Sequence, residues 1–170
     1  LVSFSTSPST TVSAELASSD IAVDLHLQQR RKGLLWFATY GVGFVGDYTI
    51  QNTLDQPVTA TVSFEFPASG TIYDDFQFRV NETTTTPHGD AGRDLKAQVR
   101  LAPKEEAAIH VAYKSRGLES WRYSFGDSIN TVKNFRLIAT TDFDDINFPA
   151  QTISASTKTK TDRGWQLEWQ

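Results

Sequence analysis

A chain of 170 residues has the usual size of one domain and could bury roughly 70% of the surface that its unfolded form exposes. Cysteine is absent, which excludes disulfide bonds, thiolate metal sites and cysteine nucleophiles. The formal net charge of -4 leaves no basic stripe of the kind that binds DNA or RNA, so we expect no nucleic-acid partner.

Methionine is also absent, and the chain begins at Leu1 and runs into Gln170 without a turn signal. We therefore expect it to be part of a longer protein. No apolar run approaches the roughly 18 to 20 residues that a membrane-spanning helix needs.

Period-two alternation of apolar and polar residues, which is typical of strands with one buried face, runs along most of the chain. In the first half it predicts strands at 21–27, 34–40, 48–51, 59–66 and 76–80. A turn is expected at 30–33, and bulges are expected where Gly41, Gly43 and Gly46 interrupt the second strand. The polar segment 52–57 predicts a hairpin that pairs 48–51 with 59–66.

The second half continues the alternation. It predicts strands at 95–101, 107–113, 121–125, 135–143 and 165–169, with 132–138 as an alternative helical turn. Segment 81–90 has no periodicity and is expected to be an exposed loop, and Pro103-Lys104-Glu105 is the expected turn between two strands. About ten short strands without a helical period between them indicate an all-β, antiparallel β-sandwich. We expect one domain over 1–170, with a possible sub-boundary near 117.

Four segments carry a resemblance to a known family. They are Gly33-Leu34-Leu35-Trp36-Phe37, Gly46-Asp47-Tyr48-Thr49-Ile50-Gln51-Asn52, Ile72-Tyr73-Asp74-Asp75-Phe76 and the run from Thr141 to Pro149. They resemble the extracytoplasmic region of bacterial inner-membrane proteins of the CreD-like kind. The resemblance implies a periplasmic or exterior β-rich domain, joined to the inner membrane by flanking helices of the parent protein. It supplies no catalytic residues and leaves an envelope protein as a possible partner.

Four oxygen-bearing side chains lie within six residues at Asp142, Asp144, Asp145 and Asn147, a density that calcium can use. An EF-hand is excluded, because Asn147 and Ile153 stand where that loop needs Gly and Glu. Acidic residues between aromatic ones more often hold backbone amides at a strand end. We therefore expect a strand-end connection and no cofactor, with calcium on Asp142, Asp144 and Asp145 as the alternative.

Asp74 and Asp75, together with Glu119 or Asp127, could supply the paired carboxylates of a glycosidase. The same Asp-Asp pair is equally typical of a loop before a strand. We therefore expect no enzyme activity, and a hydrolase that uses Asp74, Asp75 or Asp142 is the least favoured alternative.

The three histidines give no metal site, because none has ligand spacing to another. His26 and His110 fall on the polar face of their strands, and His88 lies in the threonine-rich loop. We expect all three to be surface residues.

Six aromatic residues could form a platform for sugar rings: Trp36, Tyr40, Trp121, Tyr123, Trp165 and Trp169. All six lie in the apolar phase of their strands, where large aromatic side chains are more often core. We expect core positions, with Trp121 as the first exception because it opens its strand near a loop.

Together these patterns predict a non-catalytic extracytoplasmic domain of a bacterial multi-pass inner-membrane protein, with a structural, sensory or partner-binding role. Loops 81–94 and 142–149 are the surfaces expected to meet a partner. The alternative is a carbohydrate-binding β-sandwich module of a secreted enzyme.

Overall fold

The computed structural model describes residues 2–6, 10–13, 16–66, 71–85, 88–89, 94–124, 132–150 and 152–170. The strands are β1 (Val2–Thr6), β2 (Thr10–Ser13), β3 (Leu16–Lys32), β4 (Leu35–Gln51), β5 (Val58–Glu65), β6 (Ile72–Val80), β7 (Thr83–Thr84), β8 (His88–Gly89), β9 (Asp94–Leu101), β10 (Glu106–Leu118), β11 (Phe135–Thr141), β12 (Thr157–Lys160) and β13 (Trp165–Trp169). These described residues contain no helix, and therefore none that could cross a bilayer.

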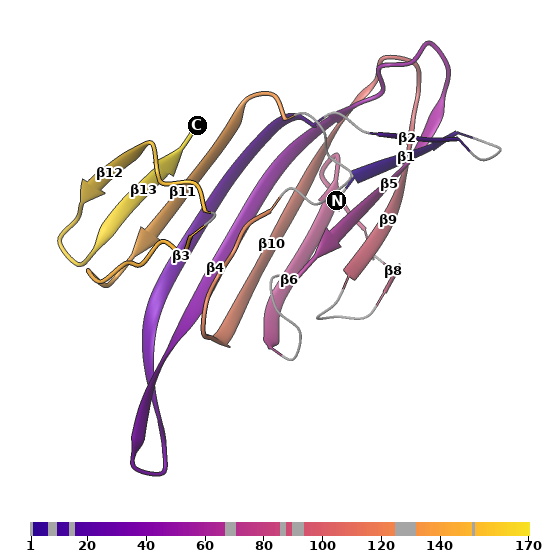
Figure 1. Cartoon of the computed structure of the whole chain (residues 1–170). Helices are drawn as coiled ribbons and strands as arrows, with labels where there is room; N and C mark the ends of the chain where they lie inside the picture. Colours follow the sequence, from indigo (N-terminus) through magenta and orange to yellow (C-terminus); the bar gives the residue numbers. More distant parts are fainter. Residues whose placement is uncertain are drawn as a thin grey trace.

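The strands form two sheets (Figure 1). The large sheet has the order β12-β13-β11-β3-β4-β10-β6-β7, and the small sheet has the order β2-β1-β5-β9-β8. All neighbours are antiparallel except β3 and β11, which run parallel. Parallel neighbours need a long connection, and here residues 33–134 lie between them. The predicted all-β sandwich is therefore confirmed, with a large sheet that is mixed and not purely antiparallel.

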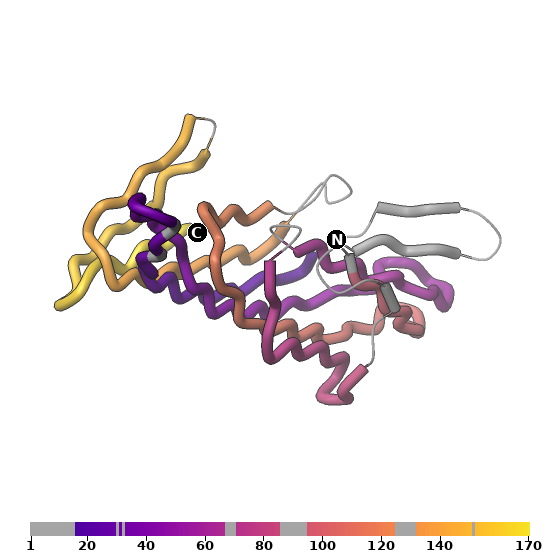
Figure 2. Tube along the Cα trace, turned by 90° about the horizontal axis from the view of Figure 1, so that it is seen from below, coloured from indigo at the N-terminus to yellow at the C-terminus, as the bar shows by residue number. Residues whose placement is uncertain are grey.

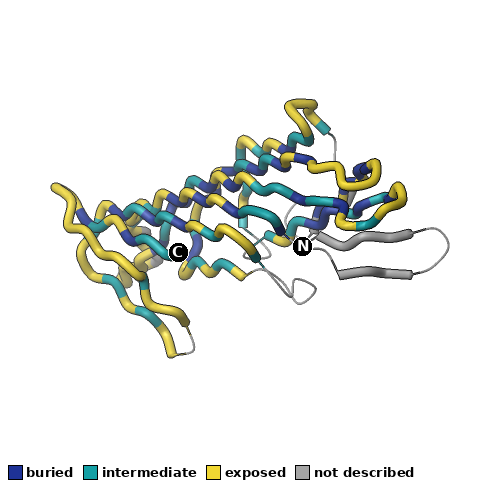
Figure 3. Tube along the Cα trace, turned by 90° about the horizontal axis from the view of Figure 1, so that it is seen from above, coloured by how far each residue is buried: buried dark blue, intermediate teal, exposed yellow. Residues whose placement is uncertain are grey.

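The small sheet packs over the end of the large sheet that lies away from the C-terminal strands (Figures 1 and 2). The hydrophobic core includes residues of both sheets and continues to Leu137 of β11 and Leu167 of β13. Buried and exposed positions alternate along the central strands, as a one-sided sheet requires (Figure 3). Aromatic rings join the layers: Phe44 of β4 stacks on Tyr113 of β10 at 4.8 Å between ring centroids and lies 5.8 Å from Phe64 of β5. Such ring contacts add to the stabilisation from buried area.

The predicted hairpin between 48–51 and 59–66 is wrong, because segment 52–57 carries the chain from the large sheet to the small one. β4 pairs with β3 and β10, whereas β5 pairs with β1 and β9. Buried Asn52 fixes this crossing: its side-chain amide donates to the carbonyl of Gln56 at 2.9 Å and to that of Ala102 at 2.7 Å. The return crossing passes through the predicted turn at Pro103, so one side chain holds both crossings together.

Two further local predictions are corrected. Residues 121–124 form no strand; they lie as a loop that stacks Trp121 on Tyr123, with Phe135 beyond. The expected glycine bulges in β4 are also absent from its pairing with β3 there. The register shift lies instead on β10 between Arg116 and Leu118, where Gly117 has a φ of 85°. The alternative helical turn at 132–138 is wrong, because β11 begins at Phe135.

Candidate functional site at the free end and base of the β3–β4 hairpin

Strands β3 and β4 extend beyond both of their neighbours in the large sheet (Figure 1). Pairing of β11 with β3 stops at Leu25, and pairing of β10 with β4 stops at Tyr40. Beyond Leu25 and Tyr40 the two strands pair only with each other within the part of the chain that the structure describes. The result is a two-stranded ribbon that stands free of the sandwich.

The predicted turn closes this ribbon. Gly33 has a φ of 63°, and Leu34 completes the two-residue connection. Glycine with positive φ at the first of two central positions is what a type II′ turn requires, and this turn matches the twist of antiparallel strands. The Arg31 side chain donates from Nε to the Gly33 carbonyl oxygen at 2.9 Å, which further fixes the turn.

Large apolar side chains cover the outer part of the ribbon. We call residues 31–37 the hairpin end; in it Leu34 is 88% exposed and Leu35 and Trp36 are each 65% exposed, with Phe37 also exposed. Because successive strand residues point to opposite faces, Leu35 and Phe37 lie on one face and Trp36 on the other. The hairpin end therefore presents apolar side chains on both faces and at its turn, while the residue paired with Trp36 on β3 is the basic Arg31.

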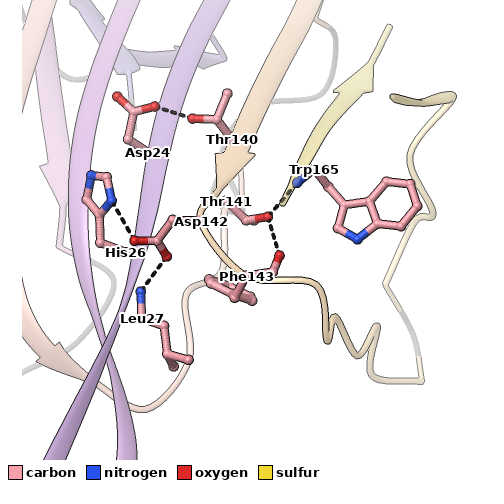
Figure 4. Close-up of polar contacts among 8 residues, drawn as sticks. All are labelled: Asp24, His26, Leu27, Thr140, Thr141, Asp142, Phe143 and Trp165. Carbon is pink, nitrogen blue, oxygen red and sulfur yellow. Dashed lines mark hydrogen bonds and ion pairs between the residues drawn. The ribbon is translucent and has the colours of Figure 1, made fainter. Parts of the chain in front are cut away.

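Asp142 holds the base of the ribbon, directly after β11 ends (Figure 4). Its Oδ1 accepts a hydrogen bond from the backbone N–H of Leu27 at 2.8 Å, and its Oδ2 lies 3.2 Å from His26 Nδ1. The backbone N–H of Asp142 donates to the Leu25 carbonyl at 3.3 Å. Pairing between β11 and β3 ends at Leu25, and the Asp142 carboxylate supplies the next hydrogen bond to β3.

A depression of about 370 Å³ opens beside this base. It is lined by Leu25, His26, Thr140, Thr141, Asp142, Thr161, Asp162 and Arg163. The Thr141 hydroxyl donates to the Phe143 carbonyl at 2.8 Å and accepts from the Trp165 N–H at 2.9 Å (Figure 4). The polar groups drawn there therefore bond mainly to one another and to the backbone.

The acidic cluster proposed for calcium is spread over separate contacts. Asp142 binds β3, and Asp144 forms an ion pair with Lys160. The backbone carbonyl of Asp144 also accepts from the Trp165 indole N–H at 3.0 Å. Among the residues with described positions, no group of three or more histidine or acidic side chains could hold a metal ion. Calcium on Asp142, Asp144 and Asp145 stays a prediction for which this geometry gives no support.

The carboxylates considered for hydrolysis lie on the outer face of the large sheet. Asp74 binds Arg116 and Asp75 binds Lys114, each at 2.8 Å. The hydrogen bond from Lys114, reinforced by its charge, lowers the pKa of the Asp75 carboxyl. Glu119 is exposed, and position 127 lies outside the described residues.

The aromatic residues divide into two groups. Five of the six pack against the core with partly buried rings: Tyr40, Trp121, Tyr123, Trp165 and Trp169. The core prediction is wrong for Trp36, which is exposed on the hairpin end. The sequence did carry a signal for this, because Gly33 to Phe37 is an unbroken apolar run next to a turn and lacks the alternation of a one-sided strand.

Two histidines lie on the polar face of the large sheet, as predicted. His26 meets Asp142, and His110 Nδ1 lies 2.7 Å from Asp47 Oδ1. Each of these two histidines contacts an acidic side chain, and the side chain of His88 is outside the described set. The predicted partner loop at 81–94 is described in part: Asn81 Oδ1 accepts from the Ala108 N–H at 2.8 Å.

Comparison with known proteins adds information on the fold. No family model matches the chain, and no curated protein matches it. Among solved structures it is similar to a Legionella pneumophila protein described only provisionally as nutrient-binding, with a TM-score of 0.60 and 14% identity over 99% of this chain and 64% of that one. It is also similar to an M1 zinc metallopeptidase from Deinococcus radiodurans, with a TM-score of 0.48 and 13% identity over 92% of this chain and 38% of that one.

The chain thus spans less than two thirds of the length of either structure. At 14% identity the first similarity shows a shared fold and nothing about activity, and the second is too distant to carry an argument. The class that can be stated is a β-sandwich with a long projecting hairpin.

Proposed function

We propose that this chain is a non-catalytic, extracytoplasmic domain of a bacterial inner-membrane protein, and that it acts by contact. The observation that carries the proposal is the hairpin end, where large apolar side chains stand free in solvent on a ribbon outside the sandwich. Contiguous exposed apolar groups of this kind mark interaction sites on proteins. The CreD-like resemblance of the segment Gly33 to Phe37, which forms most of this end, supports an envelope location.

The remainder of the outer sheet face supports a contact role over catalysis. Several of its carboxylates form ion pairs with neighbouring basic groups, as Asp74 does with Arg116 and Glu168 does with Arg136 at 2.8 Å. A general acid and base need carboxyl groups that face a shared space, with their pKa values set apart. Here paired charges give a solvated surface, and most of the large exposed apolar side chains that the structure describes lie on the hairpin.

A carbohydrate-binding module of a secreted enzyme is the second candidate. One observation favours it: the exposed indole of Trp36, which could stack on a sugar ring. A sugar-binding platform usually combines such a ring with hydrogen-bonding side chains that are free to bind the sugar. Arg31, which pairs with Trp36 across the ribbon, donates its Nε hydrogen to the Gly33 carbonyl instead. For this reason we place it second.

The test uses the absence of cysteine. A single cysteine is placed in the full-length parent protein by Ile153→Cys, at a site that is 83% exposed, after any cysteines outside these 170 residues have been replaced. Ala139→Cys, at a buried site in β11, is the matched control. We expect the parent to fractionate with membranes and the Ile153→Cys protein to react with an impermeant maleimide in intact cells, while Ala139→Cys reacts only after denaturation.

Labelling of Ile153→Cys only after lysis would place the domain in the cytoplasm and refute the proposal. Recovery of the parent protein in the soluble or secreted fraction would also refute it. That second result would favour the carbohydrate-binding hypothesis. Titration of the domain and its Trp36→Ala variant with a panel of glycans would then test it.

A further inference from the structure

We propose that the hairpin end binds an anionic lipid surface by shallow insertion of Leu34, Leu35, Trp36 and Phe37. This inference deepens the proposed function and depends on it, because an extracytoplasmic domain of an inner-membrane protein is held close to such a surface. Three properties of the hairpin end favour a bilayer over a protein groove as its binding partner. They are the distribution of its apolar groups, its charge and its backbone.

Apolar side chains project from both faces of the ribbon, all of them from the turn and β4. A groove on a protein covers one face of a strand pair, and it would leave either Trp36 or the pair Leu35 and Phe37 in water. A lipid interface surrounds the inserted tip on all sides. Leu34, the most exposed of the four, lies at the turn, which would enter such a medium first.

The charge of the ribbon has the sign that anionic headgroups attract. Residues 27–40 contain Arg30, Arg31 and Lys32 and no acidic residue, in a chain whose formal net charge is -4. The three basic residues directly precede the turn. Basic side chains close to an anionic leaflet each strengthen binding, and aromatic and aliphatic neighbours add the apolar part of the affinity.

The backbone limits how deeply the end can enter. Beyond Leu25 and Tyr40 no third strand joins the ribbon in the described structure, so the outward N–H and C=O groups of both edges have no strand partner there. Such groups are not tolerated in the hydrocarbon core, whereas headgroups and water satisfy them at the interface. Insertion is therefore confined to the interfacial layer, where tryptophan indoles are enriched.

The first test is co-sedimentation of the 170-residue chain with vesicles of phosphatidylcholine alone or mixed with phosphatidylglycerol. We expect binding to the mixed vesicles that weakens as salt is raised. The variant Leu34→Glu with Leu35→Glu should bind at least about tenfold more weakly, because two leucines leave the apolar layer. Ile153→Glu, which adds a charge at an equally exposed isoleucine in a loop remote from the hairpin, is the matched control and should bind like the wild type within about twofold.

Two further measurements locate the contact. Arg31→Gln should lower binding to the mixed vesicles about fivefold, the effect of one basic group near an anionic surface. Brominated lipids should quench the tryptophan fluorescence of the wild type. The Trp36→Phe variant should still bind yet lose most of the quenching, because Trp121, Trp165 and Trp169 pack against the core.

Equal loss in the Ile153→Glu control, quenching that survives Trp36→Phe, or full binding by the double glutamate variant would each overturn the proposal, because the contact would then lie elsewhere. Binding to neutral vesicles as strong as to mixed ones would overturn the choice of anionic lipid. No binding to any vesicle would overturn the proposal and would favour a protein as the partner of the hairpin end. Since the cysteine labelling of the parent protein is independent of vesicle binding, failure of this inference is distinguishable from failure of the proposed function.

Discussion

The close approach of β13 to the end of β11 makes Gly164→Ala the most informative single substitution. A Cβ at Gly164 would lie 2.2 Å from the Thr141 carbonyl oxygen, 2.7 Å from the Thr141 hydroxyl and 2.8 Å from the Phe143 backbone nitrogen. Two of these three atoms belong to the backbone, so no change of side-chain rotamer can relieve the contact. The end of β11, the strand neighbour of β3 at the hairpin base, has to move.

The expected cost follows from two contributions. Inserting a methyl group into a closely packed site costs about 1–3 kcal/mol. Displacing the Thr141 hydroxyl also weakens its hydrogen bonds with Trp165 and Phe143, each worth about 0.5–1.5 kcal/mol. We expect a loss of about 2–4 kcal/mol in the free energy of unfolding, a large part of the roughly 5–15 kcal/mol that domains of this kind possess.

Urea unfolding followed by tryptophan fluorescence measures this loss. With a slope of about 2 kcal/mol per M, the midpoint should fall by about 1–2 M. Gly43→Ala is the matched control, because its Cβ would meet nothing closer than Asp24 Cβ at 3.8 Å. In mid-strand this control should be neutral or stabilise by up to about 1 kcal/mol. Equal midpoints for the two variants would refute the packing argument.

Two predictions concern pH. Burial raises the pKa of Tyr48, Tyr113 and Tyr123, so a spectrophotometric titration should show that these phenols do not ionise near pH 10, as free tyrosine does. The stability that they contribute is complete below about pH 10 and is lost as the pH rises through their higher folded values; ionisation of all three before near-ultraviolet circular dichroism changes would contradict their burial. The hydrogen bond from Arg136 lowers the pKa of Glu168, so the stability from this pair is present above the unfolded value of about 4.3 and is lost as the pH falls through the lower folded value. The difference in unfolding midpoint between wild type and Glu168→Gln should accordingly shrink on acidification, and a difference that grows would contradict the pairing.

The strands could be predicted from the sequence because burial on one face imposes alternation. The sets at 21–27, 76–80, 95–101 and 107–113 all lie inside observed strands. Alternation shows which face of a strand is buried, but it does not show which other strand pairs with it. For this reason the polar segment after β4 suggested a hairpin, although Asn52 turns the chain toward the other sheet.

Two aromatic residues show where residue type alone is insufficient. Trp121 and Tyr123 alternate like strand residues, yet they lie on a loop that packs against the core, because large rings can bury area without a backbone ladder. Trp36 has the same residue type as Trp121 and the opposite environment. The position of Trp36 depends on how far β10 and β11 extend beside β4 and β3, a tertiary property that no local pattern encodes.

The base of the free ribbon holds the ribbon in its position away from the sandwich. An isolated two-stranded hairpin is marginally stable in water, and apolar side chains on a loose hairpin would fold back onto the nearest apolar surface. Here β3 and β4 run unbroken from the buried sheet into the ribbon, and Asp142 continues the ladder to Leu27 after β11 has ended. The twist of a strand pair and this anchored base hold Leu34 and Trp36 away from the sandwich. A domain that keeps large apolar groups in solvent on a supported arm, while its broad sheet face carries paired charges, has a surface arranged for contact at the end of that arm.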